Sequence, residues 1–182
     1  DQLTGGLTKK GEGALTLAGA NSFKGGTTVS QGSLVLDYTS EPNSKVHATS
    51  ALTLSGGRLT VRGGNGYTQN VGNLTVRLGH AMVTNENDVG GTVLNFGATL
   101  NRDRGATFTF GSSGAPVNCD RGLNNGLMRG CALYGASTWA TWVSTNLPGY
   151  SGKCIVPYDG YSAAWSSTAN LDVTAANAGE VP

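Results

Sequence analysis

Few side chains of this chain have the types and spacing needed for metal or acid–base chemistry. The sequence holds two histidines, His47 and His80, and neither belongs to an HxH or HExxH motif. The cysteines are too widely spaced for a CxxC zinc motif. We therefore expect no metal site, no cofactor and no catalytic set.

The acidic residues leave two chemical alternatives open. They are scattered and mostly accompany turn residues, where Asp favours local hydrogen bonds to the backbone. Asp88 and Asp103 would suit glycan cleavage if the fold brought both carboxylates to one face. Residues 85–88, Asn-Glu-Asn-Asp, have the oxygen ligands for Ca²⁺, but they lack the nonapeptide of calcium-binding β-rolls. A solvated corner is the favoured interpretation of this segment.

Three cysteines, Cys119, Cys131 and Cys154, lie in the last third of the chain. In an exported protein an odd number predicts one internal disulfide and one thiol that pairs between chains or stays free. Cys119 and Cys131 flank a loop and are the easiest pair to bridge, although the sequence leaves the connectivity open. The alternative is three buried, reduced cysteines that pack as small apolar residues.

A short phrase of alternating apolar and polar residues indicates the elements that position these side chains. The second residue of each of its five copies is a leucine, at Leu15, Leu34, Leu52, Leu74 and Leu94, and the steps between them are 19, 18, 22 and 20 residues. Alternation of this kind is typical of half-buried strands. A period of about 20 residues is typical of one coil of a β-solenoid. The sequence therefore predicts an all-β fold with two short strands per coil, joined at glycine corners, and no helices.

The chain divides into two parts by composition. Residues 1–110 are expected to form regular β-helix coils, with a loop at 37–50. Residues 111–182 hold every cysteine and tryptophan and four of the six tyrosines. We interpret this part as a continuation of the β-helix with aromatic- and Cys-rich loops or a cap. Its predicted core positions are Leu133, Trp139, Ile155, Val156, Leu171 and Val173.

Charge and hydropathy exclude several classes of partner. Charged residues make up 13% of the chain and the net charge is +1, which gives no electrostatic basis for binding nucleic acid. No run of 18 apolar residues occurs, so we expect no membrane-spanning helix. The chain begins at Asp1 without a methionine, so we expect either a processed mature chain or an excised segment, and we favour a processed chain whose signal peptide has been removed.

Residues 7–34 read LTKKGEGALTLAGANSFKGGTTVSQGSL. This stretch resembles the autotransporter-associated β-strand repeat, whose pattern is close to LTKxGxGxLTLxGxNx[YF]xGxTxVxxGxL. The resemblance is firm over residues 7–36, and weaker similarity continues at 72–76, 91–98 and 155–161. It implies a right-handed parallel β-helix, exported by a Gram-negative-type bacterium and exposed at the cell surface. It assigns no catalytic residues to this chain.

Three functions remain open at this stage. The first is a non-enzymatic structural protein, whose β-helix stacks head to tail with copies of itself into an extracellular filament, sheath or surface layer. The second is an adhesin-type passenger segment that binds glycans or proteins through its loops. The third, least expected, is a polysaccharide-active β-helix enzyme.

Overall fold

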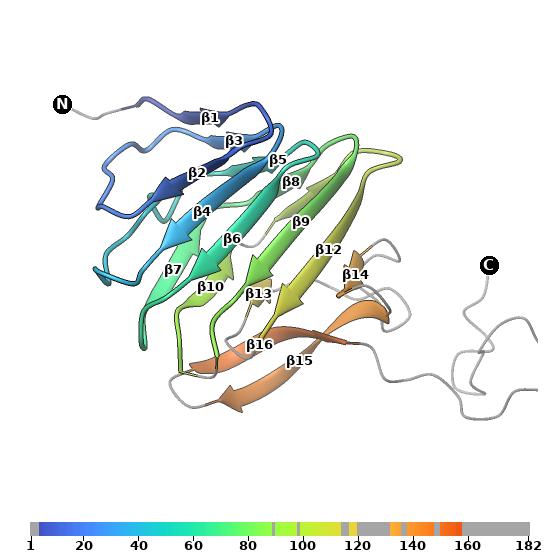
Figure 1. Ribbon diagram of the computed structural model, residues 1–182. Coiled ribbons are helices and arrows are strands. Elements are labelled where there is room, and N and C mark those ends of the chain that lie inside the picture. The colour runs from blue at the N-terminus through green and yellow to red at the C-terminus, as the bar shows by residue number, and fades with distance from the viewer. Residues whose placement is uncertain are drawn as a thin grey trace, which may run out of the picture.

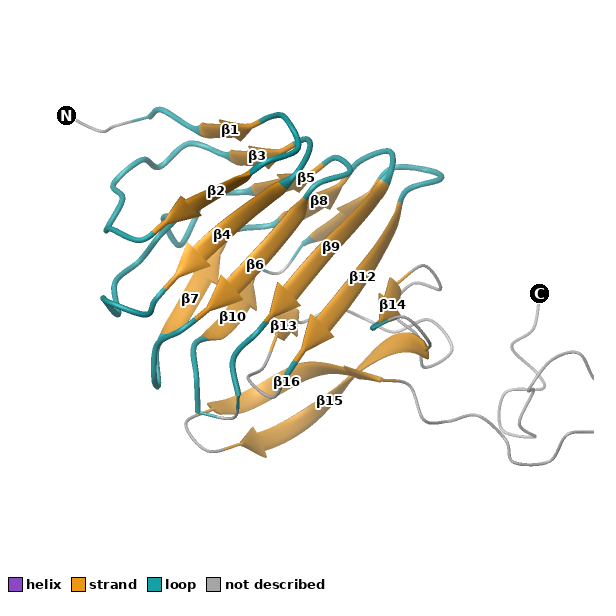
Figure 2. Cartoon of the chain, in the orientation of Figure 1, coloured by secondary structure: helices purple, strands orange, loops and turns teal. Residues whose placement is uncertain are grey.

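The computed structural model shows a β-solenoid built from three sheets (Figure 1). It describes residues 4–88, 90–97, 99–113, 117–119, 132–135, 138–147 and 150–157. The regular structure of these residues is entirely β-strand, as Figure 2 shows. No helix long and apolar enough to cross a membrane occurs in the described part of the chain. The predicted all-β solenoid is therefore confirmed.

The largest sheet has eight strands. These are β2 (Ala14–Leu17), β4 (Ser33–Asp37), β6 (Arg58–Arg62), β9 (His80–Asn85), β12 (Thr107–Ser112), β14 (Ala132–Tyr134), β15 (Thr138–Leu147) and β16 (Tyr150–Pro157). They lie side by side in chain order from β2 to β16. Pairing is parallel from β2 to β14, whereas β15 runs antiparallel to both β14 and β16.

Two smaller parallel sheets complete the coils. The five-stranded sheet contains β1 (Leu7–Lys9), β3 (Thr27–Val29), β5 (Leu52–Leu54), β8 (Leu74–Val76) and β11 (Leu100–Arg102). The three-stranded sheet contains β7 (Thr68–Val71), β10 (Val93–Phe96) and β13 (Val117–Cys119). From β6 to β13 the chain visits the three sheets in turn, so these coils have three strands rather than the predicted two.

One coil takes about 25 residues, more than the 20 expected from the repeated phrase. Ser33 of β4 lies beside Arg58 of β6, which lies beside Met82 of β9. The spacing of the repeated phrase is shorter than one coil because its copies do not all lie in the same sheet. Leu34 belongs to the eight-stranded sheet, whereas the next copy, at Leu52, belongs to the five-stranded sheet.

The core consists of columns of apolar side chains that point inward. In one column Leu34, Leu59, Val83 and Phe110 lie side by side on successive strands, and each is at most 1% exposed. Parallel pairing in register puts the inward side of each strand above the inward side of the next. Each leucine in such a column therefore contacts its neighbours in the coils above and below. Burial of a leucine side chain contributes about 1.5–3 kcal/mol.

Loops replace the third strand in the first coils. The loop expected at 37–50 is present from residue 38 to 51, and it packs against β7 instead of bulging into solvent. The buried Gln69 of β7 accepts hydrogen bonds at Oε1 from the Lys45 amide (2.9 Å) and from the Tyr38 hydroxyl. Its Nε2 donates to the Val46 carbonyl at 3.0 Å. The buried Gln69 side chain thus holds the 38–51 loop against β7, at the place where a further strand of the three-stranded sheet would otherwise lie.

The last described strands test part of the core predicted after residue 111. Ile155 is 3% exposed and belongs to the core. Leu133 is half-buried and occupies the outward column beside Thr109. Trp139 lies in β15 and Val156 in β16, whereas Leu171 and Val173 lie outside the described residues.

Leu74 and Leu15 allow a test of the columns. Leu74 is fully buried between Leu52 and Leu100, so Leu74→Ala should lower the free energy of unfolding by about 2–5 kcal/mol. Leu15 is only half-buried in the first coil, so Leu15→Ala should cost about half as much or less. Urea denaturation followed by circular dichroism measures both values. Equal losses of unfolding free energy in the two variants would contradict a core in which Leu74 is fully buried and Leu15 only half-buried.

Candidate functional site

The first coil has unpaired backbone groups along two strands. β1 and β2 are the edge strands of their sheets, and no described strand lies beyond them. The Ser33 amide donates to the Gly13 carbonyl at 3.3 Å, so Gly13 faces β4. Alternate residues of a parallel strand bond to opposite sides. The backbone N–H of Thr16 therefore faces the open side, and by the same rule so does that of Thr8 in β1, since Leu7 donates to Gly26 (3.0 Å).

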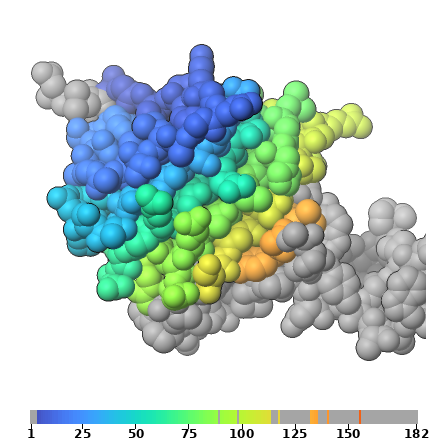
Figure 3. Space-filling view, viewed as in Figure 1, coloured from blue at the N-terminus to red at the C-terminus, as the bar shows by residue number. Residues whose placement is uncertain are grey.

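The apolar interior is also open at this end. Leu7, Leu15, Leu17 and Phe23 pack on the core yet remain only partly buried. The corresponding leucine of the next coil, Leu34, is fully buried. Figure 3 shows the first coils as a blue band at one end of the described stack. Unpaired strand edges combined with half-buried leucines are typical of a surface that accepts another strand.

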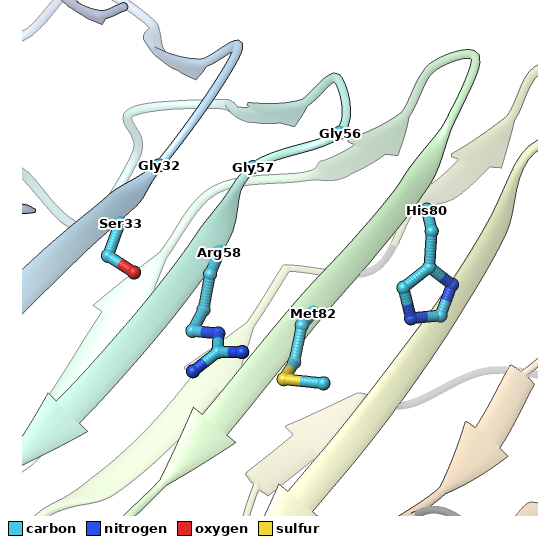
Figure 4. Close-up of a pocket in the computed structure, with 7 residues that line it drawn as sticks. All are labelled: Gly32, Ser33, Gly56, Gly57, Arg58, His80 and Met82. Carbon is cyan, nitrogen blue, oxygen red and sulfur yellow. The ribbon is translucent and has the colours of Figure 1, made fainter. Parts of the chain in front are cut away.

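A hollow of about 340 Å³ lies on the outer face of the eight-stranded sheet (Figure 4). Ser33, Arg58 and Met82 line it from three neighbouring strands, at positions that the register places side by side. Its floor is formed by corner glycines, among them Gly32 and Gly56. Gly32 has a φ of +64°, and a Cβ there would lie 2.4 Å from the Gly13 carbonyl oxygen, so no larger residue fits this corner.

Arg58 carries the unpaired positive charge of this hollow. Its side chain is exposed and makes no ion pair or hydrogen bond with other described residues. The only other arginine of β6, Arg62, is neutralised by Asp37 across the sheet, with Nη2 2.9 Å and Nε 3.0 Å from Oδ2. An unpaired guanidinium beside the Ser33 hydroxyl is suited to binding a carboxylate or a similar anion.

His80 forms a wall of the hollow. Its Nδ1 lies 3.0 Å from the Thr107 hydroxyl and its Nε2 lies 3.2 Å from the Thr109 hydroxyl, both on β12. Both ring nitrogens are therefore occupied by neighbours within the sheet. The other histidine, His47, has Nδ1 2.9 Å from the Thr49 hydroxyl in the 38–51 loop. The structure does not bring the two histidines into one site.

Asp37 is held in its ionised form. The Thr39 amide donates to Oδ1 at 2.9 Å, and Arg62 binds the other oxygen. These interactions, with the Thr39 hydrogen bonds contributing most, lower the pKa of Asp37 from its ordinary value of 3.8 to about 2. A carboxylate with such a low pKa is an ion-pair partner and a poor general acid.

The acidic residues proposed for glycan cleavage do not converge. Asp88 follows β9, at the corner that leads to the three-stranded sheet. Asp103 follows β11, at the corner that returns to the eight-stranded sheet, and lies 3.8 Å from Arg77. The two carboxylates therefore belong to different corners of the coil. In the described part of the chain, no three His, Cys, Asp or Glu residues cluster as metal ligands.

The 85–88 corner is structural. Asn85 and Asn87 are buried, and the Asn85 amide donates to the Thr92 carbonyl at 2.9 Å. Asn87 Nδ2 in turn donates to Asn85 Oδ1 at 2.9 Å. The Asn85 amide oxygen is therefore already used within the corner, and only Glu86 and Asp88 of this segment are exposed.

The disulfide candidates stay a prediction. Cys119 is the last residue of β13 and pairs in register with Phe96, and Cys154 lies in β16 opposite Val143. Cys131 lies outside the described residues.

The stack of parallel coils around an apolar interior defines the molecule as a β-solenoid. Residues 7–36, from β1 to β4, match the passenger-associated-transport-repeat. No curated protein and no solved structure gives a match. The repeat and the solenoid together fit the β-helix of an autotransporter passenger, as the resemblance implied. Such a repeat indicates a secreted or surface-exposed protein.

The hydrogen bonds of Thr39 and the ion pair with Arg62, both made by Asp37, make stability depend on pH. Because the pKa of Asp37 is lowered on folding, its contribution is present above pH 3.8 and is lost as the pH falls through about 2. Asp37→Asn should lower the free energy of unfolding by about 1 kcal/mol at pH 7 and by almost nothing near pH 2. Thermal unfolding of both proteins between pH 7 and pH 2 measures the difference.

The matched control is Asp88→Asn, which removes an exposed carboxylate outside this pair. It should leave the melting temperature unchanged at every pH. A loss at pH 7 that persists unchanged at pH 2 in Asp37→Asn would show that the charge of Asp37 is not the cause.

Proposed function

We propose that this chain is a non-enzymatic structural segment of an exported bacterial protein, and that copies of it stack head to tail through the β-helix. The product would be an extracellular filament, sheath or surface layer. The observation that carries the proposal is the open first coil of the described structure. There the N–H groups of Thr8 and Thr16 have no strand partner, and Leu7, Leu15 and Leu17 are only partly buried. A second copy offers a complementary surface.

The five-stranded sheet suggests how two copies would meet. β1 and β11 lie at its opposite edges. Its outward residues form a ladder of Thr8, Thr28, Thr53, Thr75 and Asn101. Pairing β1 of one copy with β11 of the next in the same parallel register would place Thr8 beside Asn101. The ladder and the apolar column behind it would then continue from copy to copy. In the same contact β2, the open edge of the eight-stranded sheet in the first coil, would meet β16, the opposite edge of that sheet. Such an arrangement does not close and therefore forms fibres.

The family match supports the non-enzymatic part of the proposal and the location. The passenger-associated repeat is typical of the structural β-helices of exported proteins, and it is not typically enzymatic. In this chain it occupies the coil with the open edge. The repeat therefore lies where stacking would take place.

Thr16→Pro tests the contact. Proline removes the backbone N–H that faces the open side and leaves the side of β2 that pairs with β4 intact, a position where strands tolerate proline. The wild-type protein should form rods whose mass grows with concentration, and Thr16→Pro should lower the association constant by about tenfold or more. Sedimentation velocity over a wide concentration range, with negative-stain electron microscopy, measures both.

The matched control is Thr16→Val, which keeps the N–H and the branched side chain. It should assemble as the wild type does, and circular dichroism should show that both variants are folded. A wild-type protein that stays at the mass of one chain at every concentration would overturn the proposal. So would a folded Thr16→Pro variant that assembles normally. Loss of rods in reductant would add an interchain disulfide to the contact.

A further inference from the structure

A second hollow continues the first along the outer face of the eight-stranded sheet. It has a volume of about 480 Å³. Its lining residues are His80, Met82, Thr84, Thr109, Phe110, Gly111, Leu133 and Gly135. His80 and Met82 line both hollows, so the two form one surface depression that crosses β4, β6, β9, β12 and β14. We call this depression the outer groove. It runs across the strands, from coil to coil.

The two halves of the outer groove differ in chemistry. The first half holds the exposed, unpaired guanidinium of Arg58 and the hydroxyl of Ser33. The second half is walled by Met82 and Leu133 and by two glycines. The Thr109 hydroxyl lies 3.2 Å from His80 Nε2, so this polar group is already engaged. A ligand that matches the whole groove therefore has an anionic group at one end and an apolar remainder.

The same features disfavour two other kinds of extended ligand. The strands under the groove from β4 to β12 have a paired strand on each side, so their backbone groups are not available to an added peptide strand. A sugar chain needs hydrogen-bond partners for its hydroxyls along its whole length. The second half of the groove offers few hydrogen-bond partners. A hydrocarbon chain needs no hydrogen-bond partners.

Gly111 creates the depth of the second half. It occupies the outward column after Thr60 and Thr84, where a side chain would otherwise stand over the sheet. A Cβ at Gly111 would lie 3.8 Å from Thr84 Cγ2, an ordinary contact, so packing within the sheet does not require glycine here. Glycine inside a strand often marks a bulge, a bend or the close approach of a ligand or of another backbone. The hollow that Gly111 lines favours a ligand here.

We propose that the outer groove binds an anionic amphiphile, with its carboxylate on Arg58 and Ser33 and its hydrocarbon chain over Met82, Gly111 and Leu133. The guanidinium binds the carboxylate with paired hydrogen bonds, and the chain is removed from water along its length. From β6 to β14 the groove crosses three strand spacings, or about 14 Å. The site lies on the side of the solenoid and does not depend on end-to-end stacking.

Isothermal titration with sodium decanoate below its aggregation concentration, at pH 8 and constant ionic strength, tests the proposal. The wild-type protein should bind decanoate saturably at one site per chain, and sodium acetate, which has the head group alone, at least tenfold more weakly. Arg58→Gln should weaken decanoate binding by about tenfold. Gly111→Val should weaken it by a similar factor, because its methyl groups occupy the place of the chain.

Arg104→Gln is the matched control, because Arg104 is an exposed arginine at the corner before β12 that does not line the groove. It should bind as the wild type does, and so should Thr16→Pro. Leu133→Thr provides a second variant of the apolar half if Gly111→Val fails to fold, and it should also bind more weakly. Each variant is accepted only if its circular dichroism spectrum and melting temperature match the wild type.

Three results would overturn the proposal. They are the absence of saturable decanoate binding, acetate binding as tight as decanoate binding, and decanoate binding that is unchanged in folded Arg58→Gln or in folded Gly111→Val.

Discussion

Parallel pairing in register is the constraint on which the rest of this structure depends. Because each strand lies beside the equivalent strand of the next coil, an inward leucine always meets another inward apolar residue, as in the column of Leu34, Leu59, Val83 and Phe110. The same register arranges outward residues into ladders that run along the solenoid. The apolar core, the threonine ladder of the five-stranded sheet and the outer groove are three consequences of this one arrangement.

In-register pairing also determines which surfaces are left unsatisfied. Every coil inside the stack has neighbours on both sides, so its backbone groups and its leucines are covered. Among the described residues the first coil has a neighbour on one side only, and for that reason Leu15 is half-buried there while Leu34 is fully buried. The open end and the outer groove therefore arise separately. The open end comes from the position of β2 at the edge of the described sheet, and the outer groove comes from the small side chains of one outward column.

The strands and the repeat could be predicted from the sequence, because alternation at Leu15 and Leu34 is a local pattern. The coil length could not, since the same phrase occurs in different sheets: Leu52 follows Leu34 in the chain but lies in the five-stranded sheet. The outer groove could not be predicted from the sequence either. Ser33, Arg58 and Met82 become neighbours only through a register that depends on the lengths of the loops between them.

The first coils show how polar side chains replace a missing strand. Asn21, a residue of the repeat pattern, donates through Nδ2 to the Lys45 carbonyl at 3.1 Å, and Lys45 donates through its amide to Gln69. The buried Lys45 ammonium is held by carbonyl oxygens of Ala18 and Glu41 (3.1 Å for the latter) instead of a carboxylate. Each of these loops thus forms hydrogen bonds with the next coil, as the strands do. Within the repeat at residues 7–36, Asn21 therefore links its loop to the loop of the next coil at a place where no strand forms.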